Sequence, residues 1–210
     1  MHLDAAAEFD RQLGTLLDLG DPALAGLPVA DFTALLAPLR AVAEAAGGAP
    51  ATADRVPFVV VLPAKLVPVA ATMPLTALDG RPGGVAGLLP DVERFVPTDL
   101  APAPAPEPYL LVDVDRGAEF RNRAPEAALP VLAERGRSPL TVEEGVALVT
   151  HFPGTLVKNH CFSLAGSRAG DRRVPALWIS RRAPVLGWCW AGNPHTWLGV
   201  ASAARRLGAA

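Results

Sequence analysis

The sequence has few cysteines and no long uninterrupted apolar run, and each shortage excludes a class of protein. Two cysteines in 210 residues are too few for a disulfide framework or a zinc cluster. The longest apolar stretch, residues 56–78, is interrupted by Lys65 and by four prolines, which would remove donors from a membrane helix and bend it. The first residues lack the basic start and apolar core of a secretory signal. We therefore expect a cytoplasmic protein that does not enter the membrane.

What is present is typical of a folded globular chain. Half of the residues are apolar and 19% are charged, so the chain can bury a core. Twenty-two prolines and nineteen glycines predict many turns and short elements. We expect residues 1–210 to form a single α+β domain, with helices packed on a mixed or antiparallel sheet.

The charge is distributed unevenly along the chain. Residues 1–150 carry eleven basic and twenty acidic side chains, whereas residues 151–210 carry eight basic and one acidic. Such an asymmetry indicates either two halves that attract each other within one fold or a surface for an anionic partner. The net charge of −2 and the lack of a known nucleic-acid-binding module disfavour nucleic acid without excluding it.

Four helices are predicted, two of them within a helical N-terminal part of residues 1–50. Apolar residues at helical spacing indicate a helix over 3–18, and Asp31 is a good N-cap for a second helix that ends near Ala46. Pro38 predicts a kink in that helix or its division into two pieces. Further helices are expected over 125–136 and, from the capping box of Thr141 and Glu144, over 141–151.

Apolar runs rich in β-branched residues predict strands over 56–62 and 109–115, joined by a proline-rich, extended connector at 97–108. In the second strand, alternation places Tyr109, Leu111, Asp113 and Asp115 on one face. The tryptophan- and arginine-rich segment 158–206 contains strands over 160–164, 176–181 and 185–191, with a fourth over 198–203. Their short connections predict a C-terminal antiparallel β-meander.

The same C-terminal segment holds the residues most suited to binding. Guanidinium groups pair with phosphate or carboxylate, and indole faces pair with rings or cations. The alternative is that the tryptophans fill the core and the arginines are solvated at loop tips. The candidate ligand-binding residues are Arg168, Arg172, Arg173, Trp188, Trp190, Asn193 and His195, accompanied by Arg181, Arg182, Trp178 and Trp197.

Asp113 and Asp115 form a candidate metal site. Two carboxylates on one face of a strand can share a Mg²⁺ ion, and an apolar strand followed by Asp-x-Asp resembles the nucleophile strand of haloacid-dehalogenase-type phosphotransferases. That resemblance implies a Mg²⁺-dependent phosphate-ester hydrolase, but the later acidic pair of those enzymes has no good match here. The alternative is that both aspartates end the strand and bind turn amides or Arg116.

Cys189 and His195 form a second candidate catalytic pair, six residues apart across the turn at 192–194. A cysteine hydrolase needs a thiolate with a neighbouring base in an electropositive setting. Both cysteines lie in apolar predicted strands, however, where a cysteine packs as a small hydrophobe. Metal binding by His160, Cys161, Cys189 and His195 has an unfamiliar spacing.

Several long motifs resemble a known family: YLLVDVDRG, PLTVEEGVALVTHFP, CFSLAGSRAGDRRVPALWIS and LGWCWAGNPHTWLGVASAARR. Together they resemble a family of uncharacterised, mostly actinobacterial proteins with a domain of unknown function. The resemblance implies a bacterial protein of a single domain type and carries no activity, cofactor or catalytic residue. Our leading hypothesis is a non-enzymatic module that binds an anionic small molecule or a peptide or protein partner.

Overall fold

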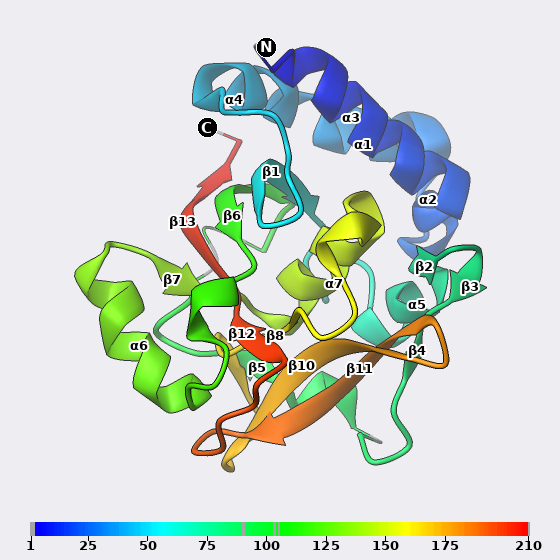
Figure 1. Ribbon diagram of the computed structural model, residues 1–210. Helices are drawn as coiled ribbons and strands as arrows, with labels where there is room; N and C mark the ends of the chain where they lie inside the picture. Colours follow the sequence, from blue (N-terminus) through cyan, green and yellow to red (C-terminus); the bar gives the residue numbers. More distant parts are fainter. Residues whose placement is uncertain (1–2, 90, 103, 105, 210) are drawn as a thin grey trace.

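The computed structural model describes residues 3–89, 91–102, 104 and 106–209, and it places helix α7 between two sheets (Figure 1). The first sheet has the order β1-β6-β13-β7, in which every neighbouring pair is antiparallel. Its strands are β1 (Arg55–Val61), β6 (Tyr109–Asp115), β13 (Ser202–Gly208) and β7 (Ser138–Pro139). The strands β1 and β6 match their predicted positions to within one residue.

The second sheet contains the predicted meander. Strands β8 (Cys161–Ser163), β10 (Arg173–Ser180) and β11 (Ala183–Trp190) follow one another with antiparallel pairing. Two parallel strands flank them, β12 (Leu198–Val200) beside β8 and β4 (Gly84–Val85) beside β11. The predicted strand over 198–203 is therefore two strands, since the chain leaves the second sheet at Ala201 and continues as β13 in the first. The class is α+β, as predicted.

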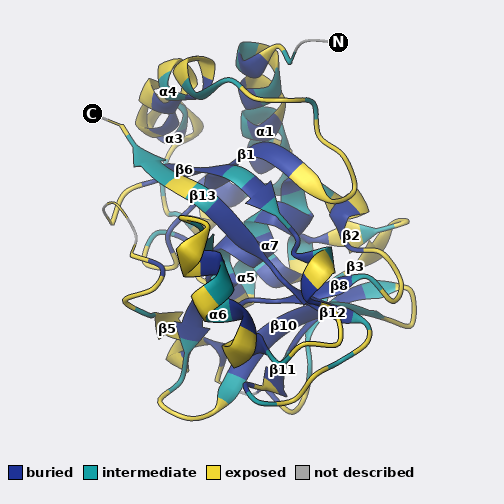
Figure 2. Cartoon of the chain, turned by 60° about the vertical axis from the view of Figure 1, so that its left-hand side comes forward, coloured by how far each residue is buried: buried dark blue, intermediate teal, exposed yellow. Residues whose placement is uncertain are grey.

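Four helices cover one face of the first sheet: α1 (Ala5–Leu19), α2 (Asp21–Leu24), α3 (Val29–Leu36) and α4 (Pro38–Ala46) (Figure 2). Their apolar side chains, among them Phe9 and Phe32, pack against Phe58 and Leu110 of the sheet. Pro38 divides the predicted second helix into α3 and α4, which is one of the two predicted outcomes. The first piece begins at Val29 after Pro28, so the prediction of Asp31 as N-cap was wrong.

The opposite face of the first sheet, helix α7 (Val142–His151) and the second sheet share the larger core. The predicted capping box is present, because Thr141 accepts from the amide of Glu144 while Glu144 accepts from the amide of Thr141. Gly145 lets Leu164 approach the helix, since a Cβ there would lie 2.3 Å from its side chain. The remaining elements are α5 (Val69–Thr72), α6 (Pro125–Glu134), β2 (Ala77–Leu78), β3 (Arg81–Pro82), β5 (Val96–Pro97), β9 (Ser167–Arg168) and 3-10 turns at Met73–Leu75, Val92–Arg94, Ala118–Phe120 and Pro153–Thr155.

A buried ionic network joins four elements: β13, α7, β7 and β6. The guanidinium of Arg206 on β13 contacts both carboxylate oxygens of Glu144 on α7, at 2.5 and 2.8 Å, and also donates to Ser138. Tyr109 on β6 donates its hydroxyl to the same carboxylate at 2.9 Å. Glu144 is fully buried, yet the guanidinium, the phenol and the Thr141 amide all donate to its oxygens. Burial and this carboxylate raise the pKa of Tyr109.

Alternation in β6 stops at Asp113, whose φ is +52°. Tyr109, Leu111 and Val114 all belong to the larger core, although strict alternation would place Val114 on the opposite face. The prediction that Asp113 and Asp115 continue the face of Tyr109 and Leu111 was therefore wrong. A positive φ is strained for a residue with a Cβ, and it redirects the strand at this point.

The predicted connector at 97–108 has no helix or strand after β5 in its described part, and Ala101 within it is buried. Residues 103 and 105 of that segment lie outside the described residues. Across the described ranges, no helix combines the length and the apolar character needed to cross a membrane.

Candidate functional site

All four tryptophans of the chain line one groove of about 450 Å³ on the second sheet. Trp188 and Trp190 come from β11, Trp178 from β10 and Trp197 from the turn before β12. Asn193 and His195 complete the wall at the end of β11, and Ala86 and Leu88 close the other side. The structure therefore brings together four predicted site residues: Trp188, Trp190, Asn193 and His195.

The groove lies where β11 becomes an edge strand. β4 pairs with β11 only at Val185 and Leu186, and the amide of Ala86 donates to the Leu186 carbonyl. Backbone groups in an antiparallel ladder alternate in direction, so the groups of Trp188 also point away from β10. The carbonyl of Trp190 receives the amide of Asn193, which turns the chain away from the strand. Between Leu186 and Trp190, the backbone groups of Trp188 therefore face the groove and have no backbone partner among the described residues, while the Trp188 indole N–H donates to the Leu88 carbonyl.

Glycine shapes the floor of the groove. A Cβ at Gly187 would lie 2.1 Å from the ring of Trp178, so only glycine allows this indole to lie across β11. Trp178 makes an edge contact with Trp197, and Trp188 makes one with Trp190. Trp190 is 46% exposed and Leu88 is 79% exposed. Large apolar side chains thus remain accessible beside an unpaired strand edge, which is a combination that favours association.

The predicted arginines do not line this groove, and each has a partner nearby. Arg168 donates to the backbone carbonyls of Ala165 and Ser167, and burial lowers its pKa. Arg172 pairs with Glu126 at 3.0 Å. Arg173 pairs with Asp171, and its guanidinium lies over the rings of Phe95 and Trp188. These three candidate binding residues therefore do not join the tryptophans in the groove.

Arg181 and Arg182 lie still farther from the groove. They form the turn between β10 and β11, both with positive φ, at the opposite end of the hairpin from Trp190. An eight-residue strand spans roughly 25 Å, so one compact ligand cannot contact both ends. The basic charge of segment 158–206 is therefore distributed over the second sheet instead of being focused.

Cys189 and His195 both line the groove, as the cysteine-hydrolase hypothesis requires. Burial raises the pKa of the Cys189 thiol to about 12, and the charge of Arg168 offsets only part of this shift. The thiol is therefore protonated at neutral pH, which disfavours nucleophilic attack. Both cysteines are free and buried, and Cys161 has a raised pKa for the same reason.

Asp113 and Asp115 lie in a different place, a polar cleft of about 310 Å³ beside β13. Asp113 accepts from Arg137 at 2.7 Å, and Asp115 accepts from Arg55 and from the Gly117 amide. Arg116 pairs instead with Asp54. No group of three or more histidine, cysteine, aspartate or glutamate side chains suited to a metal ion occurs among the described residues. The two carboxylates thus bind guanidinium and amide groups.

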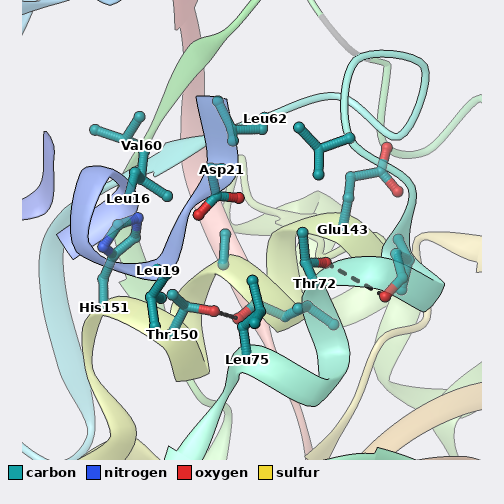
Figure 3. Close-up of a pocket in the computed structure, with 14 residues that line it drawn as sticks. Leu16, Leu19, Asp21, Val60, Leu62, Thr72, Leu75, Glu143, Thr150 and His151 are labelled. Carbon is teal, nitrogen blue, oxygen red and sulfur yellow. Dashed lines mark hydrogen bonds between the residues drawn. The ribbon is translucent and has the colours of Figure 1, made fainter. Parts of the chain in front are cut away.

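A second cavity was missed by the sequence analysis. A space of about 660 Å³ lies between the loop at 63–69, the segment at 92–97 and the first turn of α7. Val69 and Glu143 line this outer cavity and also a smaller chamber of about 30 Å³ under the helical cover (Figure 3). The polar side chains of the chamber are Asp21, Thr72, Glu143, Thr150 and His151.

The ionisable groups of the chamber are strongly perturbed. Asp21 is 2% exposed, and burial raises its pKa to about 6. His151 is 3% exposed, and burial together with the charge of Arg11 lowers its pKa to about 3. Neither ring nitrogen of His151 makes a hydrogen bond of standard geometry among the described residues, and an interaction with the backbone of Val60 offsets part of the pKa shift. Burial also raises the pKa of Glu143. Perturbed groups around a cavity are a signature of functional sites.

Local sequence gave little sign of this chamber. Asp21 belongs to a Gly-Asp-Pro turn, Glu143 to the first turn of a helix and His151 to the last, and each is a common residue at its position. The only available signal was an Asp and a His flanked by strongly apolar stretches.

One comparison with known proteins gives a match. The model of the Family of unknown function (DUF5701) matches residues 15–209 of the chain. No curated protein and no solved structure matches it.

Proposed function

The chain belongs to this family of unknown function, and we propose that it is a binding module that takes an extended segment of a partner protein in the tryptophan groove. The observation that carries the proposal is the coincidence of an unpaired strand edge with four indoles. An added strand pairs its backbone with such an edge, and pockets on either side select alternate side chains. The groove volume of about 450 Å³ suits two or three side chains.

The groove favours a peptide over a compact anion. Its walls are the tryptophans with Ala86, Leu88 and Leu198, and its polar side chains are Asn193 and His195. The guanidinium of Arg173, which lies over the ring of Trp188, is paired with Asp171. A small anion would have to compete with that carboxylate, whereas a peptide backbone requires no free cation.

Two further statements belong to this proposal. We infer that the chain acts as one domain, because the first sheet combines strands from residue 55 to residue 208. We also infer a cytoplasmic location, because two free, buried cysteines suit a reducing compartment.

Tryptophan fluorescence can test the proposal, because every tryptophan lines the groove. Twelve-residue peptides would be selected on the purified protein from a random phage-displayed library and then titrated in solution. We expect a saturable change in emission, and we expect N-methylation of alternate peptide amides to abolish binding in one register and spare it in the other. Peptides that bind equally well when N-methylated in either register would contradict strand addition.

Variants then locate the binding. Trp190→Ala removes an exposed wall, and Gly187→Val displaces Trp178 from the floor. Each is expected to weaken a selected peptide at least tenfold, with the circular dichroism of the fold retained. Leu24→Ala, an exposed apolar residue on α2, is the matched control and should leave affinity unchanged. Equal affinities in all three variants would overturn the assignment of the groove.

A further inference from the structure

The outer cavity beside Glu143 has the features of a small-molecule site. Its volume of about 660 Å³ falls in the range of ligand pockets, and it is larger than the tryptophan groove. Four prolines, Pro63, Pro68, Pro97 and Pro106, contribute rigid apolar walls together with Val69, Val92, Phe95 and Val96. Its charged lining residues are two glutamates, Glu93 and Glu143, and one lysine, Lys65. An apolar body therefore fits between the walls, and the excess of carboxylate favours a cation.

The chamber behind Glu143 offers mainly hydrogen-bond acceptors. Thr72 and Thr150 donate their hydroxyl protons to backbone carbonyls of their own helices, which leaves only oxygen lone pairs for the chamber. Asp21 contributes a carboxyl group, and neutral His151 contributes one acceptor nitrogen and one N–H. With about 30 Å³, the chamber has room for about two water molecules, since each needs roughly 10–15 Å³. A group that fits it must therefore be small and rich in donors.

Glu143 is the residue that both spaces share. Its side chain lies along the edge of the chamber, and its carboxylate points away from Asp21 (Figure 3). In the ionic network of the core, Arg206 binds Glu144, the next residue, and no ion pair of Glu143 with an arginine or lysine occurs among the described residues. A cation from outside would supply the missing charge.

We propose that this site binds a small primary amine, with its ammonium group at the Glu143 carboxylate and its apolar body between the proline walls of the outer cavity. An ammonium group has three donors and a single positive charge, so it supplies the countercharge that Glu143 lacks among the described residues. The buried polar groups of the adjoining chamber, Asp21 and His151, are a second sign that this region accepts a polar group. This site is separate from the tryptophan groove and does not depend on it.

Calorimetry with matched probes tests the charge of the head group. Phenethylamine, 2-phenylethanol and 3-phenylpropionate carry the same ring on a short chain that ends in ammonium, hydroxyl or carboxylate. We expect the amine to bind at least tenfold more tightly than the alcohol and the carboxylate not to bind. Equal binding of amine and alcohol, or no binding of the amine at millimolar concentration, would overturn the proposal.

Variants test the position of the ammonium group. Glu143→Gln keeps the size of the side chain and removes its charge, so it should abolish the preference for amine over alcohol. Asp21→Asn should weaken the amine less, and Glu93→Gln, a carboxylate of the same outer cavity, is the matched control with a small expected effect. Trp190→Ala should leave amine affinity unchanged, which separates this site from the groove. A Glu143→Gln variant that keeps the full preference would contradict the assignment.

Two measurements on the unaltered chain do not depend on the folding of a variant. The side-chain carboxyl ¹³C resonance of Glu143, assigned by its loss in Glu143→Gln, should shift on titration with phenethylamine and stay unchanged with 3-phenylpropionate. The anomalous signal of 4-bromophenethylamine in a crystal should place the bromine among the proline walls. Bromine located elsewhere, or a Glu143 carboxyl resonance that does not respond, would rule the site out.

Discussion

Two adjacent glutamates on α7 are buried in opposite ways. Glu144 is fully buried, and Arg206, Tyr109 and the Thr141 amide all donate to its carboxylate. Glu143 lies one residue earlier, lines two cavities and has a raised pKa because burial penalises its charge. A glutamate thus stabilises the core at residue 144 and is available to bind a ligand at residue 143. What differs is whether the fold supplies the countercharge.

The largest expected effect comes from removing the countercharge of Glu144. Arg206→Met leaves the Glu144 carboxylate buried without its cation, and we expect a loss of about 3–5 kcal/mol in the free energy of unfolding. Urea denaturation followed by circular dichroism measures it. Arg205→Met changes an exposed neighbour on the same strand and serves as control. A cost no larger than that of Arg205→Met would show that the network contributes nothing specific.

A gain in stability is expected where a buried carboxyl group has no countercharge among the described residues, as at Asp21. The pKa of Asp21 is about 6 in the fold and 3.8 ordinarily, so its ionisation opposes folding. The stability associated with the protonated form is complete below pH 4 and is lost as the pH rises through 6. Asp21→Asn should therefore stabilise the protein by up to about 3 kcal/mol at pH 7–8 and change little at pH 4.

Thermal unfolding of both proteins at pH 4, 6 and 8 checks the Asp21 prediction. His151 acts in the opposite sense, because its lowered pKa removes stability as the pH falls below about 6.5 toward 3. The Asp21→Asn variant lacks the stability that the natural protein gains when Asp21 becomes protonated. Its free energy of unfolding should therefore fall more steeply on acidification than that of the natural sequence. A gain from Asp21→Asn that does not vary with pH would contradict the titration of Asp21.

Glu143→Gln should also increase the stability of the protein, but by less than Asp21→Asn does. The pKa of Glu143 is raised by burial, but its own backbone amide and the Thr141 hydroxyl stabilise the carboxylate in part. We expect a modest gain in the midpoint of urea denaturation at pH 8 and none below the ordinary range of glutamate. Destabilisation at pH 8 would mean that Glu143 is as well satisfied as Glu144, and the contrast between the two would fail.

The smallest effect is expected for an exposed pair. Arg40 on α4 pairs with Asp10 and Glu44 in solvent, with all three side chains about half exposed. Water and salt screen such contacts, so Arg40→Ala should leave the denaturation midpoint within the error of measurement. A large effect would imply that ion pairing stabilises this fold regardless of burial.

Much of the local structure could be predicted because it depends on neighbouring residues. The strand at 109–115, the capping box of Thr141 and Glu144 and the division at Pro38 all follow from short-range patterns. The positive φ of Asp113 was not predictable, since it depends on how β1 and β13 hold β6 from both sides. The prediction of a single strand over 198–203 failed for a similar reason, because one residue separates β12 from β13 and these strands belong to different sheets.

The candidate sites divide in the same way. The tryptophans, Asn193 and His195 are close in sequence on one hairpin and its following turn, so their convergence was predictable. The arginines share that segment but bind other groups: Arg172 pairs with the distant Glu126, and Arg168 and Arg173 bind groups within three residues of themselves. Asp21, Glu143 and His151 come from an N-terminal turn and from both ends of α7. Only the packing of α1 and α2 on the sheet brings them together.

The place of β13 has a consequence for how the protein is made. This strand, Ser202–Gly208, is inserted between β6 and β7 and carries Arg206, so the first sheet stays divided until those residues arrive. During synthesis, one edge of β6 stays unpaired until β13, about ninety residues later in the chain, has been made. Chaperones can bind that edge in the meantime. The first sheet is therefore expected to close only after residues 202–208 have been synthesised.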